Sequence, residues 1–162
     1  MIKKFKVGQN QHQKIEINQP GRWEVVLSGT GAEVEVVGVF DAQGREKIDL
    51  EVIIHHRAPH TRATVTLKGV VRDQAQLKFL GRIIIDEKCG DTNSFLTERI
   101  LLLSDQARAE AIPELEILSD DVKCTHAASI SCLDESQLFY LMSRGVSRAQ
   151  AEEMLVEGFL SI

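Results

Sequence analysis

The chain has 162 residues, a length that suits one domain with a hydrophobic core of its own. Its composition is ordinary, with 43% hydrophobic and 27% charged residues, and this excludes a disordered or collagen-like chain. The formal net charge of −5 argues against a basic surface for nucleic acid, so no nucleic-acid partner is expected.

The sequence predicts a protein of the reducing cytosol. No apolar segment follows the charged N-terminus Met1–Lys6, so we expect no secretory signal. The longest aliphatic run, Ile100–Leu103, is far too short to cross a bilayer, and we expect no membrane contact. The number of cysteines is odd, which favours free thiols at Cys89, Cys124 and Cys132.

Residues 13–118 are predicted to form strands almost without interruption. Apolar and polar side chains alternate clearly in Ile48–Val52 and in Arg62–Lys68, which places the apolar side chains on one face. Turn residues such as Gly29-Thr30-Gly31 separate the runs. The expected strands are Arg22–Ser28, Glu33–Phe40, Glu46–Ile54, Arg62–Val71, Ala75–Ile85 and Ser94–Leu103.

The spacing of these predicted strands limits the possible fold classes. The runs begin roughly every 10 to 15 residues, which suits a β-sandwich, a barrel or a solenoid and leaves no room for helical crossovers. A faint repeat places a glycine inside the strand in Val36–Phe40, Leu67–Val71 and Phe79–Ile83, as at bulges and close backbone approaches. Stacked rungs of two strands would give a period of roughly 20–25 residues. The repeat alone does not separate a solenoid from a sandwich.

The C-terminal quarter changes to a helical pattern. Asp134 is a suitable N-cap for a first helix, and Gly145 suits the left-handed residue that ends it. Ser147 and Gln150 form a capping box that opens a second helix. We therefore expect helices at residues 134–143 and 147–159.

Five segments match a known family pattern in the correct order along the chain. Two long ones are Leu115–Ala128, with the letters DDVKCTHAA, and Leu133–Val146, with LDESQLFYLMSRGV. Three short ones precede them, at His56–Thr61, Leu67–Val70 and Leu101–Ser104. Over about residues 50–160 the sequence resembles the SufB/SufD family of iron–sulfur cluster assembly proteins, and SufD in particular. Where the family has a glycine after the histidine, this sequence has alanine.

The resemblance implies an all-β fold with a small helical C-terminus. A right-handed parallel β-helix is expected over residues 1–133, followed by two short α-helices within residues 134–162, together forming a single domain. The family's long N-terminal helical region and its tail after the second helix are missing from this sequence, so we expect a short form.

The resemblance also implies a function in iron–sulfur cluster assembly, as a scaffold or interaction protein without catalytic activity. The expected partner is a second copy of the chain or a SufB/SufD-like chain. A SufC-like ATPase is a further candidate partner, although the tail that the family associates with SufC docking is not found here.

Cys124 and His126 form the sharpest candidate site. Residues i and i+2 of a strand face the same way, so a thiolate and an imidazole can supply two ligands to zinc, iron or a cluster. Two ligands do not close a site, and in a homodimer a two-fold axis would bring two of each together. The alternative is a buried thiol beside a histidine that only hydrogen-bonds. Because the resemblance puts the matching positions near the SufB–SufD interface, we expect them on the final strand beside a subunit interface, with an iron–sulfur cluster or iron as the ligand.

The weaker candidates for a metal or interface site are Cys89, Cys132, His56 and His60. Cys89 is expected in a turn and Cys132 just before the first helix, and neither has CxxC spacing, so both are interpreted as structural or incidental thiols. His56 and His60 are expected to share a strand face, although Pro59 disturbs their spacing. A polar turn without metal is the favoured interpretation of these two histidines.

Two other functions stay open at this point. A β-helical enzyme acting on polysaccharide would need clustered Asp and Arg on one solenoid face, and the sequence does not show such a cluster. A degenerate interaction module would bind no cluster at all. The sequence contains no G-x-S-x-G, P-loop or G-x-G-x-x-G motif, and we expect no enzymatic activity.

Overall fold

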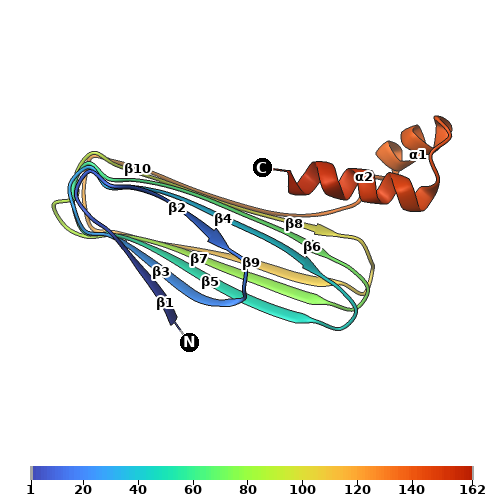
Figure 1. Cartoon of the computed structure of the whole chain (residues 1–162), viewed down its shortest axis with the longest axis horizontal. Coiled ribbons are helices and arrows are strands. Elements are labelled where there is room, and N and C mark those ends of the chain that lie inside the picture. The colour runs from blue at the N-terminus through green and yellow to red at the C-terminus, as the bar shows by residue number, and fades with distance from the viewer. Residues whose placement is uncertain (1, 162) are drawn as a thin grey trace.

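The computed structural model describes residues 2–161 and shows a parallel β-helix with two helices at its C-terminal end (Figure 1). Odd-numbered strands form one five-stranded sheet, which we call sheet A, and even-numbered strands form the other, sheet B. The strands are β1 (Ile2–Val7), β2 (His12–Ile17), β3 (Gly21–Leu27), β4 (Glu33–Ala42), β5 (Lys47–His56), β6 (Arg62–Val71), β7 (Gln76–Ile85), β8 (Thr92–Leu102), β9 (Arg108–Ile117) and β10 (Val122–Cys132). The fold class implied by the resemblance, a parallel β-helix followed by two short helices, is confirmed.

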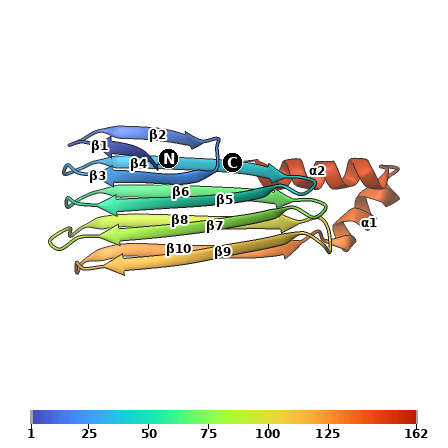
Figure 2. The same ribbon diagram turned by 90° about the horizontal axis from the view of Figure 1, so that it is seen from below.

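Each rung consists of one strand from each sheet, and Figure 2 shows the rungs stacked in order. In the first turn Ile2 lies beside Arg22, a repeat of 20 residues. In a later turn Glu33 lies beside Arg62, a repeat of 29 residues. The predicted period of 20–25 residues is therefore wrong beyond the first turn, because the strands lengthen from 6 residues in β1 to 10 in β4.

The six expected strands correspond to β3–β8, with small differences at their ends. The bounds of β6 are as predicted, whereas β5 extends to His56 instead of Ile54. Strand β1 lies before the region that the sequence predicted to be extended. Strands β9 and β10 were not among the strands named from the sequence, and they form the last rung.

The core lies between the two sheets and is built from alternate residues of each strand. In β6, Ala63, Val65 and Leu67 point inward and are buried, as the alternation predicted. The next inward residue is Gly69, where an added Cβ would collide with the side chain of Leu77 from the opposite sheet. The glycine of the repeat thus provides room for a large side chain across the core, which is the close approach that a glycine within a strand indicates.

A column of residues in the left-handed backbone conformation runs along one edge of the solenoid, where the chain passes from sheet A to sheet B. Its members are Asn10, Gly31, His60, Asp91 and Asp121, with φ between 52° and 73°. The strand registers place them at equivalent positions of successive rungs. Gly, Asn and Asp tolerate this conformation best, and this explains the choice of four of these five turn residues.

The two helices begin at the predicted caps. Helix α1 (Glu135–Ser143) starts after Asp134, whose side chain accepts a hydrogen bond from the Ser136 backbone N–H. Helix α2 (Arg148–Leu160) has the predicted capping box of Ser147 and Gln150. In the described part of the chain, neither helix is long and apolar enough to cross a membrane.

Helix α2 lies against the outer face of sheet B (Figure 1). Its Val156 packs on Val70 of β6 and Leu101 of β8. Lys68 of β6 donates hydrogen bonds to the carbonyl oxygens of Phe159 and Ser161, at the C-terminal end of α2. A cation at this end of a helix interacts favourably with the helix dipole, so Lys68 ties the helix to the sheet.

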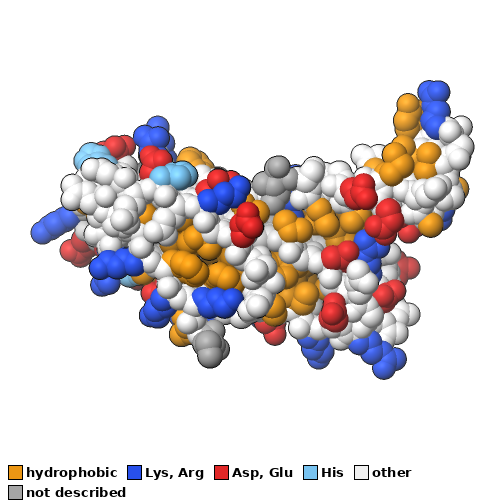
Figure 3. All heavy atoms as spheres, viewed as in Figure 1, with side chains coloured by type: hydrophobic (Ala, Val, Ile, Leu, Met, Phe, Trp, Pro, Cys, Tyr) orange, Lys and Arg blue, Asp and Glu red, His pale blue; other side chains and the backbone are white. Residues whose placement is uncertain are grey.

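The outer faces of the solenoid carry mixed charge. Figure 3 looks along the stack of rungs and shows hydrophobic side chains between the two sheets, with acidic and basic side chains around them. Many of the charges pair between neighbouring strands: Lys4 with Glu24 at 2.8 Å, and Arg22 with Glu51 at 3.4 Å. Exposed pairs of this kind contribute little stability each, about 0–1 kcal/mol. They identify these faces as solvated surface.

Candidate functional site at the last rung

The last rung, formed by β9 and β10, ends the stack in the described part of the chain. Strand β9 is hydrogen-bonded to β7 and β10 to β8, each on one side. The inward side chains of this rung are therefore uncovered: Leu115 is 49% exposed, Ile117 40% and Ile130 44%. An apolar end with unpaired backbone groups is a surface on which another chain can dock.

The edge strands of the solenoid differ in their protection against pairing. Strand β1 is short and carries Lys3, Lys4 and Lys6. Strand β9 contains Pro113, which cannot donate a backbone hydrogen bond, and several charges. Strand β10 has 11 residues, of which Lys123 is the one Lys, Arg, Asp or Glu. Strand β2, the fourth edge strand, is short and carries Lys14 and Glu16. Because charges, prolines and short length are what protects an edge strand, β10 is the least protected of the four.

Cys124 and His126 lie on β10 and point inward, while Thr125 between them is exposed on the outer face. The Cys124 side chain packs against the core, and burial raises the pKa of its thiol. The His126 side chain is 2% exposed. The structure thus brings the two candidate residues onto one face of the final strand, as predicted.

Glu98 of β8 is a third residue of this site, and the sequence analysis missed it. Its side chain is fully buried, and its Oε2 lies 3.4 Å from Nε2 of His126. The signal was present in the sequence, because Leu96 and Ile100 alternate as inward residues and Glu98 stands between them. A glutamate at an inward strand position is rarely fully buried unless it is paired.

One chain does not complete a metal site here. Among residues 2–161, no group of three or more His, Cys, Asp or Glu side chains is arranged to hold a metal ion. The arrangement on β10 is one thiol and one imidazole per chain, so a tetrahedral site would need further ligands from elsewhere.

The weaker histidine candidates are not brought together. His56 is fully buried in the core, with Nδ1 2.7 Å from Thr61 Oγ1 and Nε2 2.9 Å from Ser94 Oγ. Burial lowers the pKa of His56 to about 4, with a smaller contribution from His55. His60 is exposed in the left-handed turn, where its Nδ1 lies 2.8 Å from Asp91 Oδ2. The expectation that His56 and His60 share a strand face is wrong, because the chain leaves the strand after His56.

The other two cysteines have different surroundings. Cys89 is buried, and its Sγ lies 3.7 Å from the backbone oxygen of His56. Burial raises the pKa of the Cys89 thiol. Cys132 is exposed at the far end of β10, in a hollow beside the helices.

These surroundings predict an order of thiol reactivity. With iodoacetamide at neutral pH, Cys132 should react first, Cys124 more slowly and Cys89 last, because the thiolate is the nucleophile and burial disfavours it. Mass spectrometry of peptides after timed labelling measures the three rates, with protein unfolded in guanidinium as the control in which they converge. Labelling of Cys89 as fast as Cys132 in the folded protein would contradict the burial seen here.

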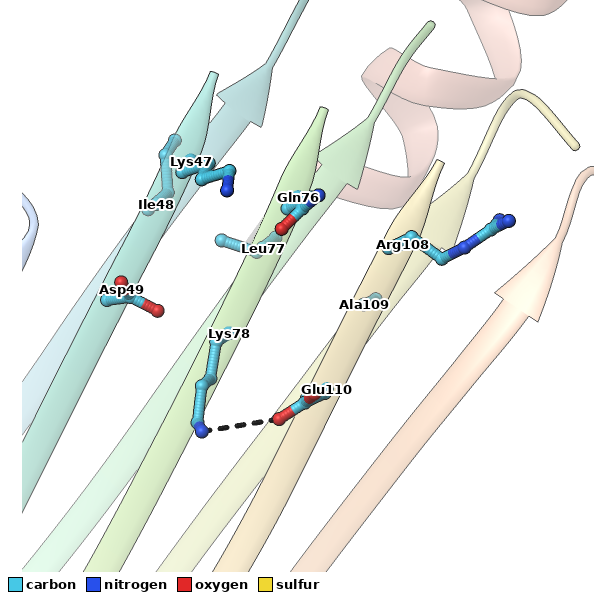
Figure 4. Close-up of a pocket in the computed structure, with 9 residues that line it drawn as sticks. All are labelled: Lys47, Ile48, Asp49, Gln76, Leu77, Lys78, Arg108, Ala109 and Glu110. Atoms are coloured by element: carbon cyan, nitrogen blue, oxygen red, sulfur yellow. Dashed lines mark ion pairs between the residues drawn. The ribbon is translucent and has the colours of Figure 1, made fainter. Parts of the chain in front are cut away.

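A β-helical enzyme acting on polysaccharide would need clustered charged side chains on one face of the solenoid. Charged side chains line a groove on the outer face of sheet A (Figure 4). Its charged side chains come from three successive strands, and Lys78 of β7 pairs with Glu110 of β9 at 3.3 Å. Both are well exposed, and Arg108 donates to the backbone oxygens of Asp105 and Ala107. The groove therefore carries a row of solvated, paired charges on neighbouring strands of sheet A.

Comparison with known proteins shows the same family by a sequence profile and by individual relatives. Residues 12–159 match the profile described as SUF system FeS cluster assembly, SufBD core domain. An iron-sulfur cluster assembly SufBD family protein of Mycobacterium leprae is 32% identical over 143 residues, covering 83% of this chain and 36% of that protein. One of Staphylococcus saprophyticus is 32% identical over 135 residues, covering 83% of this chain and 29% of that protein. The chain thus spans about a third of the length of these relatives.

Proposed function

Because the chain belongs to the SufBD family, we propose that it is a non-catalytic scaffold for iron–sulfur cluster assembly, with iron or a cluster precursor held as cargo at Cys124 and His126. The observation that carries the proposal is the place of this pair. Both side chains lie on the inner face of the last rung, on the least protected edge strand of the solenoid.

The chemistry of the pair suits this cargo. Thiolate and imidazole are ligands for iron and zinc, and thiolates hold most iron–sulfur clusters. The half-buried Cys124 and the nearly buried His126 lie beside apolar inward side chains, so these two side chains are partly shielded from water. A low-dielectric surrounding of this kind strengthens the interaction of a cation with its ligands.

The partner that we propose is a second copy of the chain, paired through β10. A two-fold axis is the commonest symmetry of soluble oligomers. Antiparallel pairing of two β10 edges would satisfy their free backbone groups and cover the exposed apolar side chains of the last rung. Each pair would then contribute two Cys124 and two His126, the number of ligands in a tetrahedral site.

Metal loading of matched variants tests the function. The wild type, Cys124→Ser, His126→Ala and Cys132→Ser proteins are exposed to ferrous iron without oxygen, desalted, and analysed for metal by mass spectrometry. The wild type and Cys132→Ser, which changes an exposed cysteine of the same strand, should retain iron, whereas the other two should lose most of it. Equal and negligible iron and zinc in all four proteins would contradict the proposal and leave Cys124 and His126 a structural role.

A further inference from the structure

The buried carboxyl group of Glu98 is an unusual feature of the core. Its neighbours in register are Leu67 of β6 and Ala128 of β10, and the inward residues on either side along β8 are Leu96 and Ile100. A carboxylate in such surroundings is costly unless it is paired and hydrogen-bonded. Replacing a buried ion pair as a whole by apolar residues of similar volume is often neutral or stabilising, so the fold by itself does not explain the residue.

In the opposite sheet, a glycine leaves space for this carboxyl group. Gly81 of β7 faces Glu98 across the core, and a Cβ added to Gly81 would lie 2.6 Å from Oε1. The same Cβ would lie 2.8 Å from Leu96 Cδ2. A glycine at this position therefore leaves the space that the carboxyl group occupies.

The hydrogen bonding of the pair is incomplete within the chain. Oε2 of Glu98 lies 3.4 Å from His126 Nε2, and both side chains are at least 98% buried. Among the described residues, Glu98 Oε1 and His126 Nδ1 are buried polar atoms with no hydrogen-bond partner. A carboxylate only accepts hydrogen bonds, so the ring nitrogen that faces it carries the proton. In the neutral imidazole the other nitrogen, Nδ1, then has a free lone pair.

We infer that Glu98 is a positioning residue, which holds His126 as the Nε2–H tautomer and leaves Nδ1 free to bind a cation. A carboxylate behind a histidine orients the ring and raises its basicity as a ligand. The inference rests on the proposed function for the identity of the cation. The tautomer itself follows from the Glu98–His126 geometry and is testable without metal.

The first test asks which ring nitrogen of His126 carries the proton in the 162-residue chain without metal. Long-range ¹⁵N–¹H spectra of protein labelled at histidine nitrogens report which ring nitrogen carries the proton, and His126→Ala assigns the signals. The wild type should show Nε2–H and a bare Nδ1, and Glu98→Met should lose this preference. Leu96→Met is the matched control, because Leu96 is the adjacent inward residue and the register neighbour of His126.

The second test is the affinity for Co²⁺ alone, followed by its absorption bands. Glu98→Met should weaken binding by about 10- to 100-fold, the range for loss of an orienting partner, while Leu96→Met leaves it unchanged. Glu98→Met should fold with a lower temperature of unfolding, because the buried Nε2–H of His126 loses its hydrogen-bond partner. A variant that does not fold would overturn the inference, since it would give Glu98 a structural role.

The failures of the two proposals are distinguishable. If the wild type binds no Co²⁺ but the tautomer depends on Glu98, the proposed cargo site is wrong and the positioning role stands. If Co²⁺ binds equally to wild type and Glu98→Met, and the tautomer is the same in both, the positioning role is wrong and the cargo site stands.

Discussion

Acidification from neutral pH to about pH 4 should destabilise the fold by roughly 3 kcal/mol through His56 alone. The pKa of His56 falls from 6.5 to about 4 on folding, because the fully buried ring disfavours its charged form. Between these values the unfolded chain binds a proton that the folded chain does not, so stability decreases as the pH falls. The full difference of about 2.5 pH units at about 1.4 kcal/mol each is about 3.5 kcal/mol, of which roughly 3 kcal/mol is lost at pH 4, where about half of the folded chains are protonated at His56.

The hydrogen bonds around His56 explain why the neutral ring is required. Thr61 Oγ1 donates to the backbone oxygen of Ala58, so it accepts a hydrogen bond from Nδ1–H of His56. Ser94 Oγ can then donate to Nε2. Each ring nitrogen of the neutral imidazole therefore has a hydrogen-bond partner. A second ring proton, on Nε2, would face the hydroxyl hydrogen that Ser94 donates.

Denaturant titrations at several pH values measure the effect at a fixed protein concentration. His56→Gln retains a donor and an acceptor without a titratable group, and its stability should be flatter between pH 6.5 and pH 4 than that of the wild type. Thr64→Gln, at an exposed position of β6, introduces the same side chain without removing a titratable group and should keep the wild-type slope. A wild-type slope in His56→Gln would show that other groups cause the acid sensitivity.

The sequence predicted much of the fold because its local signals agree with one another. The alternation in Arg62–Lys68 and the caps at Asp134 and Ser147 are local, and the structure contains all three. The number of residues per turn of the solenoid could not be predicted from such local signals. It depends on strand length, and the pairing of Glu33 with Arg62 joins residues that no local pattern relates.

The candidate site was predictable in part. The i, i+2 spacing of Cys124 and His126 was enough to place both on one face of a strand. Glu98 belongs to another strand, and its contact with His126 depends on the register of β8 with β10, where Leu96 lies beside His126. For the same reason His60 was misplaced, since its left-handed turn conformation breaks the strand periodicity.

The pairing of two chains through β10 should be weakened strongly by a single charge on its outer face. Thr125 of β10 and Thr64 of β6 are both exposed on the outer face of sheet B, and the registers place them in one row, with Phe95 of β8 between them. They differ in that β10 is an edge strand and β6 is an inner strand. Thr125→Glu would place like charges near each other in a two-fold pair, whereas Thr64→Glu adds the same charge away from the edge.

Like charges brought together at an interface cost several kcal/mol, so Thr125→Glu should raise the dimer Kd by at least about tenfold. Its fold should be unchanged, because exposed substitutions away from special features alter stability by about 0.5 kcal/mol or less.

Light scattering of the three proteins over a range of concentrations is the most direct measurement of whether the last rung is the subunit interface. The wild type and Thr64→Glu should have the mass of two chains, and Thr125→Glu the mass of one. A wild type that stays monomeric at high micromolar concentration would contradict the account, as would a Thr125→Glu protein that dimerises as tightly as Thr64→Glu.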